Sequence, residues 1–473
     1  MLTRDRTNVR KHIVSGGVVV TMLALAAPAR AQGDLQIGAS TNPFMGSAPR
    51  ATATSETIPL SVKEAVERAL QHNLGLLLQE EAVKSAHGAR WRALAGLLPD
   101  LSAGTTSSRQ VINLDAYGFP GEPSIIGPFN VFDARVYASQ PLLDLHALND
   151  ARAASANERA EVLGVRTARD LVTLVAVNLY LEAVAGASRI EAAHAQQETA
   201  QALFQQASDM KAAGVVAGID VLRAQVQVQN GRQRTIRAEN DFEKIKLQLA
   251  RAIGLPPGQP FTLTDRIPYA PLAEVTLEAA LKTALESRAD YLAARERVAA
   301  AESAQRAARA EHLPTLRLDA DYGAIGQTPS DAHSTFRVAA MVRVPIFDAG
   351  RTAAHRLESG AELQRRRAEL EDFRGRVEYD VRTALLDIGA ARQQLEAAQA
   401  NVTLAGQELE QARDRFAAGV AGNLEVAQAQ EAVAAAAESH IAALYAHNVA
   451  KASLARAVGT TEQSVMTFLG GSK

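Results

Sequence analysis

The sequence predicts a mainly α-helical protein with a transmembrane β part, built from two tandem copies of one unit. Three observations predict this fold class: a segment that occurs twice, prolines that fall into clusters, and two short stretches with the two-residue period of strands. Residues 61–101 recur without gaps at 276–316, and both copies end in Leu-Pro-x-Leu, at Leu98 and at Leu313. We therefore predict that one structural unit is used twice.

Further matching points extend the duplication over most of the chain. Pro141 matches Pro345, and the Ala-Gly-Val around Gly214 matches the same tripeptide around Gly419. The order of the matching points is the same in both copies. This predicts a first repeat at 60–254, a linker at 255–275, a second repeat at 276–459 and a C-terminal tail at 460–473.

The N-terminus has the three parts of a secretory signal peptide. Basic residues lie between Arg4 and Lys11, an apolar stretch follows at 13–27, and Ala29-Arg30-Ala31 supplies an A-x-A cleavage site. We predict a signal peptide at 1–31 and a flexible leader, rich in small and polar residues, at 32–59. The alternative is a membrane anchor, for which about 15 apolar residues are few.

Composition excludes several classes of function. The net charge of −2 gives no electrostatic case for binding nucleic acid. The chain has no cysteine, so it has no disulfide, thiol chemistry or cysteine metal site. The ten histidines are scattered, and no arrangement of a nucleophile and a base is recognisable. We therefore predict no enzyme, no cofactor and no metal site.

Long proline-free segments predict long helices, because a proline inside a helix costs about 3 kcal/mol. At 1.5 Å per residue, the longest helix of each repeat spans roughly 100 Å, about the summed length of the two shorter helices. Glycines at 164, 186, 389 and 406 lie inside these helices and predict close helix-to-helix approach. The predicted helices are 60–98, 145–211 and 219–253 in the first repeat, and 276–313, 349–416 and 424–458 in the second.

Two stretches between the helices alternate apolar and charged residues. They predict a β-hairpin at 101–140 and another at 316–345, each with strands of roughly ten residues. One face is apolar, as at Phe336 and Val338, and the other is charged. This alternation is typical of a transmembrane barrel with a polar lumen, and a soluble amphipathic hairpin is the alternative. The predicted lumen residues are Arg317, Asp319, Asp321, Arg337 and Arg343.

Two hairpins supply too few strands for a barrel, because known barrels begin at about eight strands. The chain must therefore oligomerise to cover its strand edges. Three chains would supply twelve strands, an even number.

The duplicated Leu-Pro-x-Leu and Pro junctions, together with the Gly-Val turns, resemble those of the TolC-like outer-membrane efflux protein family. The resemblance covers about residues 60–460 and lies in the order and spacing of these motifs. It implies a homotrimer with a twelve-stranded β-barrel in the lipid of the Gram-negative outer membrane and a long periplasmic α-helical barrel. It also implies a passive exit duct for efflux or type I secretion. Its implied partners are a periplasmic adaptor (membrane fusion) protein and an inner-membrane RND, ABC or MFS transporter.

The resemblance places the two Gly-Val turns at the periplasmic tip. It implies adaptor contact at Gly214, Val215, Gly419 and Val420, and an aperture constricted at Asp220, Glu425 and Gln428. Ala421 stands where an arginine locks the closed gate in the best-known members. The alternative for Asp220 and Glu425 is helix capping alone, because the helix dipole favours an acidic residue in the first turn.

One rival prediction remains, a secreted periplasmic coiled-coil structural protein without a pore. It leaves unexplained why both hairpins keep the same apolar face. A rod of this kind would be extracted without detergent. A charged residue introduced on the apolar face of its strands would have little effect, whereas it would prevent membrane insertion of a barrel.

Overall fold

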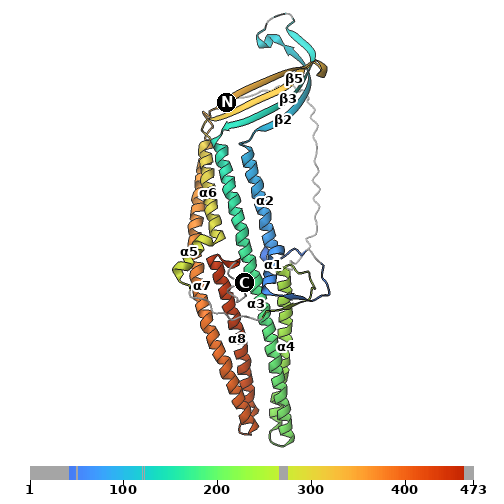
Figure 1. Cartoon of the computed structure of the whole chain (residues 1–473), viewed down its shortest axis with the longest axis vertical. Coiled ribbons are helices and arrows are strands. Elements are labelled where there is room, and N and C mark those ends of the chain that lie inside the picture. Colours follow the sequence, from blue (N-terminus) through green and yellow to red (C-terminus); the bar gives the residue numbers. More distant parts are fainter. Residues whose placement is uncertain (1–41, 50–51, 120, 122, 266–274, 463–473) are drawn as a thin grey trace, which may run out of the picture. The chain divides into compact units, whose positions relative to one another are not determined.

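The computed structural model describes residues 42–49, 52–119, 121, 123–265 and 275–462. The predicted signal peptide at 1–31 lies outside these residues. The described chain consists of long helices, a four-stranded sheet where the longest helices begin, and two tight turns at their far ends (Figure 1).

Two very long helices organise the rest of the structure. They are α3 (Leu145–Ala212) and α7 (Arg351–Ala417), and shorter helices pack along both. Helices α2 (Leu74–Ala95) and α4 (Gly218–Ala252) contact α3, whereas α6 (Ala289–Ala310) and α8 (Asn423–Val458) contact α7 and also α3. The resulting order is α2-α3-α6-α7 near the sheet and α4-α3-α8-α7 near the turns.

Small side chains let these helices pack closely. The buried residues of α7 from Val377 to Phe416 follow one another at intervals of three, four or seven residues, which places them on one face. One window of α3 is long and apolar enough to cross a bilayer, but 61% of it is buried against the other elements. It is therefore a core segment of the protomer.

The prediction of uninterrupted helices at 60–98 and 276–313 is wrong. The first is divided into α1 (Val62–His72) and α2 at Asn73, and the second into α5 (Leu277–Ser287) and α6 at Arg288. Asn73 and Arg288 occupy matching positions of the two repeats, and both have extended backbone. A polar side chain at each break supplies hydrogen bonds that an unbroken helix would not need. We call residues 72–73 the first junction and residues 287–288 the second junction.

Different groups hold the two junctions. The Asn73 amide accepts a hydrogen bond from the Gly75 nitrogen at 2.9 Å and donates one to the Phe44 carbonyl at 2.7 Å. The Arg288 guanidinium instead donates to Asp290, at 2.7 and 3.1 Å, and to Asp380 of α7 at 2.8 Å. Both Asn73 and Arg288 are buried. Each break is therefore a built feature that ties a short helix to its surroundings.

The predicted flexible leader is also wrong for the described residues of 32–59. A 3-10 turn, η1 (Pro43–Met45), places Phe44 against Gly75, where an added Cβ would lie 2.5 Å from the ring. Strand β1 (Ile58–Leu60) pairs in parallel with β4 (Phe261–Leu263), which lies in the predicted linker. Apolar burial and backbone pairing therefore order this part of the chain.

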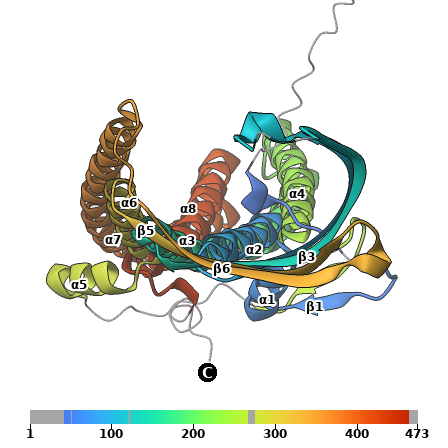
Figure 2. The same cartoon turned by 90° about the horizontal axis from the view of Figure 1, so that it is seen from above.

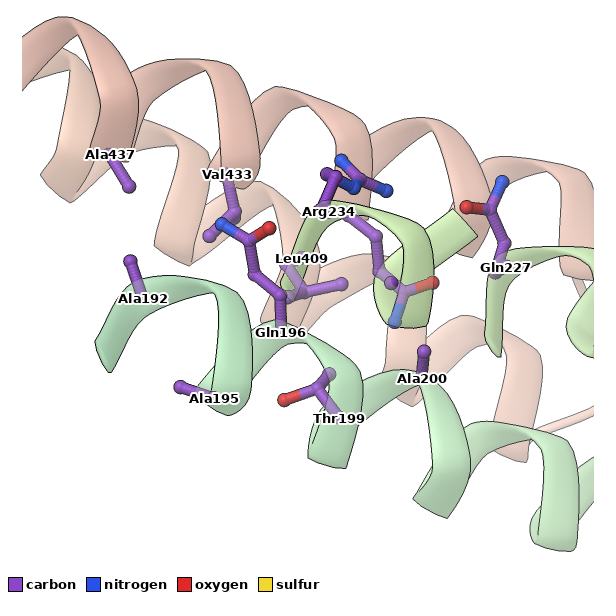
Figure 3. Close-up of a pocket in the computed structure, with 12 residues that line it drawn as sticks. Ala192, Ala195, Gln196, Thr199, Ala200, Gln227, Arg234, Leu409, Val433 and Ala437 are labelled. Atoms are coloured by element: carbon purple, nitrogen blue, oxygen red, sulfur yellow. The ribbon is translucent and has the colours of Figure 1, made fainter. Parts of the chain in front are cut away.

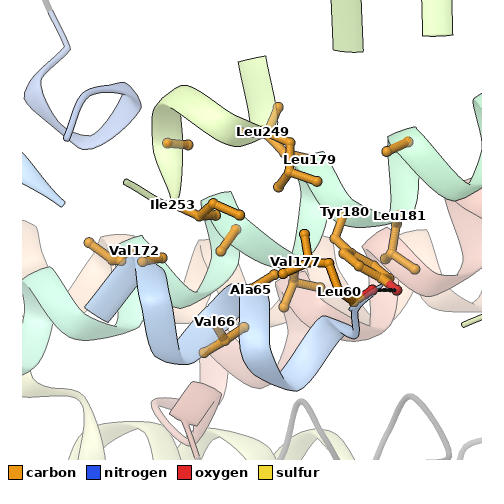
Figure 4. Close-up of a cluster of buried hydrophobic side chains, with 14 of the residues drawn as sticks. Leu60, Ala65, Val66, Val172, Val177, Leu179, Tyr180, Leu181, Leu249 and Ile253 are labelled. Carbon is orange, nitrogen blue, oxygen red and sulfur yellow. Dashed lines mark hydrogen bonds between the residues drawn. The ribbon is translucent and has the colours of Figure 1, made fainter. Parts of the chain in front are cut away.

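The main apolar core lies around the middle of α3, where the first junction meets the end of α4. Figure 4 shows Val66 of α1, Val177 of α3 and Ile253 at the end of α4 converging there. The Tyr180 hydroxyl donates to the Leu60 carbonyl at 2.9 Å within this cluster. This core fixes β1, α1 and the end of α4 to the middle of α3.

The sheet is antiparallel with the strand order β2-β3-β5-β6. Strands β2, β3 and β5, with 14, 19 and 12 residues, are longer than the roughly ten residues predicted, whereas β6 has 11 residues. Short turns η2 (Leu114–Tyr117) and η3 (Pro329–Asp331) lie at the hairpin ends. The strands are β2 (Asp100–Asn113), β3 (Ile125–Leu143), β5 (Thr315–Gly326) and β6 (His333–Arg343).

Candidate functional site

The five charged residues predicted for the lumen share one face of the sheet. In the register of β5 and β6, Asp321 is opposite Arg337 and Asp319 is opposite Ala339. Paired residues point to the same face, and every second residue of a strand does so too, so Arg317 and Arg343 lie on this face as well. Asp321 is also paired with Tyr137 of β3, which puts Asp133, Arg135 and Ser139 on this face. We call it the charged face.

Arg135 connects the charged face across three strands. Its guanidinium bonds Asp133 at 3.0 Å on its own strand and Asp321 on β5, and it donates to the Thr335 hydroxyl at 3.1 Å on β6. Asp319 accepts a hydrogen bond from Ser139 at 2.7 Å, and Arg337 lies 3.8 Å from Asp321. The two-residue period of β3 in the sequence already places Asp133 and Arg135 opposite the apolar residues, although neither was named among the lumen residues.

The opposite face of the sheet is apolar and uncovered within the protomer. Val136, Phe336 and Val338 are 51%, 77% and 64% exposed there. We call it the apolar face. A sheet with one charged and one bare apolar face requires water on one side and an apolar medium or partner on the other.

The sheet and the row of helices each have two outer members without a neighbour on one side. Among the residues that the structure describes, strands β2 and β6 each pair on one side only, so their other edges have unpaired backbone groups. Helices α4 and α7 are likewise the end members of the row α4-α3-α8-α7 and lie at its two flanks (Figures 1 and 2). Large apolar residues of α4 remain exposed, namely Ile219, Leu222, Val226, Ile236 and Leu247.

Interior glycines divide into two groups. An added Cβ at Gly186 would lie 3.1 Å from Phe242, and one at Gly164 would lie 2.7 Å from Gln79, so close packing accounts for both. The same expectation is wrong within the protomer for Gly389 and Gly406 of α7, where no described atom lies within 4 Å. An added Cβ at either position would therefore meet open space within the described protomer.

The two predicted tip turns share the same pattern of glycine and valine hydrogen bonds. Gly214 and Gly419 are left-handed, with φ of +78° and +71°. The nitrogen of each glycine, and that of the following valine, bonds back to the last turn of the preceding helix, which is the Schellman pattern. Val215 and Val420 are 60% and 73% exposed. Each turn therefore presents a bare apolar side chain at the end of a helical hairpin.

The predicted aperture residues lie in or just after the first turns of α4 and α8. The side chain of Asp220 is 16% exposed and 3.5 Å from Arg223, whereas Glu425 lies 3.6 Å from Arg415. Gln428 is exposed one turn after Glu425. Neither N-cap, Ala217 or Gly422, has a side-chain cap bond, so the acidic residues have the position that the helix dipole favours.

The structure joins the two tips through a residue that the sequence did not indicate. Buried Asn423 at the start of α8 donates its amide to the Asp220 carbonyl at 2.8 Å. An apolar cluster around Leu203, Phe416 and Val426 lies next to this bond. The α3/α4 hairpin and the α7/α8 hairpin are therefore held together at the end farthest from the sheet. Ala421 contributes only its backbone nitrogen to this turn.

A trough lies between α4 and α8, with α3 as its floor (Figure 3). Two adjoining hollows of about 220 and 800 Å³ share Gln196 and Arg234. Arg234 of α4 pairs with Glu431 of α8 at 2.7 and 3.0 Å. The trough has charges of both signs and no arrangement for chemistry. Within the described residues, no group of three or more His, Asp or Glu side chains could hold a metal ion.

Comparison with known proteins adds sequence and fold relatives. The family model described as "Outer membrane efflux protein" matches residues 65–255 and 280–460. Protein CyaE of Bordetella pertussis is 27% identical over 421 residues, which cover 87% of this chain and 86% of CyaE. The pyoverdine export outer membrane protein OpmQ of Pseudomonas aeruginosa is 26% identical, with 84% and 85% covered. The outer membrane channel CmeC of Campylobacter jejuni superposes with a TM-score of 0.73 at 17% identity, over 89% of this chain and 92% of CmeC.

Proposed function

The chain belongs to the outer membrane efflux protein family, and from this membership and the geometry we propose how it forms an exit duct. It is an outer-membrane channel protein through which an efflux or type I secretion system releases its cargo. The observation that carries the geometry is the sheet with one charged and one apolar face. Lipid would cover the apolar face and water would fill the side of the charged face.

The duct is a homotrimer in this proposal. One chain supplies four strands with open outer edges at β2 and β6, which are too few to close a barrel. Three chains that pair β6 with the next β2 would give about twelve strands, within the range of known barrels. Helices α4 and α7 occupy the corresponding end positions of the helical row. The same closure would therefore complete a helical barrel in the periplasm.

The charged face lines the barrel, and the tips form its periplasmic entrance. Lumen charges at Arg317, Asp319, Asp321, Arg337 and Arg343 would tune conductance, because charge inside the wall is solvated. Asp220, Glu425 and Gln428 would narrow the entrance and favour cations. The Asn423 bond to Asp220 supports this placement, since it fixes the acidic turns of both hairpins beside each other.

Transport through the duct is passive and is driven by an inner-membrane transporter joined through a periplasmic adaptor. The exposed turns at Gly214-Val215 and Gly419-Val420 are the adaptor contacts in this proposal. Their support is the bare apolar side chain that each Schellman turn presents at a hairpin end. An RND, ABC or MFS transporter would supply the energy, because the described chain has no recognisable nucleotide-binding motif.

The decisive experiment is the location and native mass of the mature protein. Outer and inner membranes are separated, the protein is extracted in mild detergent, and its oligomer mass is measured by native mass spectrometry. A trimer confined to the outer membrane, with conductance in a planar bilayer, is the expected result. A soluble periplasmic monomer or dimer would contradict the duct and support the coiled-coil rod.

A further inference from the structure

One rung of the sheet has an unusual composition. It runs from Gly104 of β2 through Arg135 of β3 and Gly323 of β5 to Thr335 of β6. An added Cβ at Gly323 would lie 2.8 Å from the Arg135 Cβ and would overlap the Ala134 carbonyl. The arginine therefore has a glycine on either side along the rung. Only a residue without a side chain at position 323 leaves room for Arg135 to cross β5 and reach Thr335.

This geometry holds the Arg135 guanidinium flat against the wall. Its partners are Asp133, Asp321 and the Thr335 hydroxyl, on three different strands. The side chains of Arg135 and Asp321 are each only 15% exposed, and that of Asp133 is 27% exposed. Arg337, 3.8 Å from Asp321, is 73% exposed. Arg135 is thus a wall group, whereas Arg337 extends into the adjacent solvent.

The charges of this cluster cancel. Arg135 and Arg337 carry two positive charges, and Asp133 and Asp321 carry two negative charges. Without Arg135, two adjacent carboxylates would face the water with only Arg337 to balance them. A lumen with low-dielectric walls focuses the field of such unbalanced charge, which then biases which ions enter.

We infer that Arg135 sets the charge selectivity of the barrel lumen by neutralising Asp133 and Asp321 against the wall. The inference rests on the proposed trimeric duct and deepens it, because it adds a charged group of the barrel wall to the entrance residues Asp220, Glu425 and Gln428 that are proposed to favour cations. In a trimer each substitution acts three times at one level of the barrel. Arg135→Gln would add three net negative charges to the lumen, and Asp321→Asn would remove three.

The test is the reversal potential of single channels in a planar bilayer under a KCl gradient. Salt near 0.1 M suits it, because the Debye length is then about 10 Å and charges along the wall are felt in the lumen. Arg135→Gln is expected to raise the cation-to-anion permeability ratio roughly two-fold or more, and Asp321→Asn to lower it by a similar factor. The double variant removes one charge of each sign and is expected to return close to the wild-type ratio.

Two controls separate charge from structure. Arg135→Lys keeps the charge but cannot fork between two carboxylates, so it should keep the wild-type ratio if charge is what matters. Asp321→Asn alone still tests the inference if Arg135→Gln does not insert. Channels that conduct but show the same ratio in both single variants would overturn the role of Arg135. Absence of wild-type conductance would instead contradict the proposed duct itself.

Discussion

The left-handed turn at Gly459 lies directly against the backbone of Arg288. An added Cβ on Gly459 would be 2.8 Å from the Arg288 nitrogen, and the glycine has a φ of +79°. The first repeat has a contact at the corresponding place, because Gly254, with a φ of +77°, lies against the His72 side chain. In both repeats the glycine that ends the last helix therefore packs on the junction between the two helices that come first.

Gly459→Ala is expected to destabilise the protein by roughly 2–4 kcal/mol. An L-residue at positive φ costs about 1–2 kcal/mol, and the overlap with Arg288 adds a packing cost of similar size. The matched control is Gly258→Ala, because Gly258 has a φ of +86° but no described atom within 4 Å of an added Cβ. Heat unfolding of the detergent-solubilised protein, followed by circular dichroism, measures both. Equal shifts for the two variants would contradict a role for the contact with Arg288.

The second junction should make stability depend on acidic pH. Burial raises the pKa of Asp290, but the hydrogen bonds and positive charge of Arg288 outweigh burial and leave the pKa below its usual value. The folded-state pKa is therefore lower than that of the unfolded chain. The pair's contribution is present above the unfolded value of 3.8 and is lost as pH falls through the folded value.

Asp290→Asn is expected to lower the free energy of unfolding at pH 7. Between about pH 4 and pH 2, its free energy of unfolding should fall less steeply than that of the wild type. Arg288→Met should cost about 3 kcal/mol at pH 7, because it leaves Asp290 without its buried partner. Unfolding midpoints measured across this pH range check both variants. A wild-type-like acid response in Asp290→Asn would show that other carboxylates cause it.

A charge on the apolar face should block membrane insertion. Val338 is exposed on this face, and Val338→Lys is expected to cost about 2–4 kcal/mol if the residue lies near the middle of the bilayer. The neighbouring Ala339 is on the charged face, so Ala339→Lys is the matched control and should insert normally. Heat-modifiable migration and outer-membrane fractionation provide the measurement. Equal insertion of the two variants would favour the rod over the duct.

The exposed apolar residues of α4, from Ile219 to Leu247, should pack against α7 of the next subunit. Leu247 and Gly389 both lie roughly 43 Å from the tip turns, at 1.5 Å per residue along their helices. The large side chains of α4 would lie against the glycines of α7, where an added Cβ would meet no described atom. The chain has no cysteine, so Leu247→Cys with Gly389→Cys is expected to give oxidised covalent trimers on a denaturing gel.

Asp387 supplies the control for this cross-link. It lies at the same level of α7, on the side that borders a hollow also lined by Tyr379 and Ala457. Leu247→Cys with Asp387→Cys should therefore stay uncross-linked. If the native protein is trimeric, yet neither Gly389 nor Gln393 one turn away cross-links to Leu247, the subunits must meet elsewhere.

Spacing and alternation predicted the features that depend on local chemistry. The Gly-Val turns, the two faces of the sheet and the long helices α3 and α7 follow from glycine, proline and apolar periodicity. The breaks at Asn73 and Arg288 could not be read in this way, because each is stabilised by partners distant in sequence, such as Asp380. Because one repeat has an asparagine and the other an arginine at this position, the two repeats share no local sequence pattern that would indicate a helix break.

The candidate site was likewise only partly predictable. The alternation of β5 and β6 indicated which charges share a face. It could not indicate that Arg135 reaches Thr335, about two hundred residues away, because that contact depends on the order of the strands. Asn423 was missed for the same reason, since its partner Asp220 belongs to the other hairpin. Gly389 and Gly406 of α7 are a different case. The sequence predicted close helix packing at both, but no described residue of the same chain lies beside them.

The two junctions also determine the order in which this chain can mature. Ser47 bonds the Arg251 carbonyl at the end of α4, and Ser287 bonds the Val458 carbonyl at the end of α8. The Ser47 contact can therefore form only once the end of α4, about two hundred residues later in the chain, is present. The second junction closes only when the last helix arrives. A chain that ended before this helix would lack the contacts of Val458 and Gly459 with the second junction.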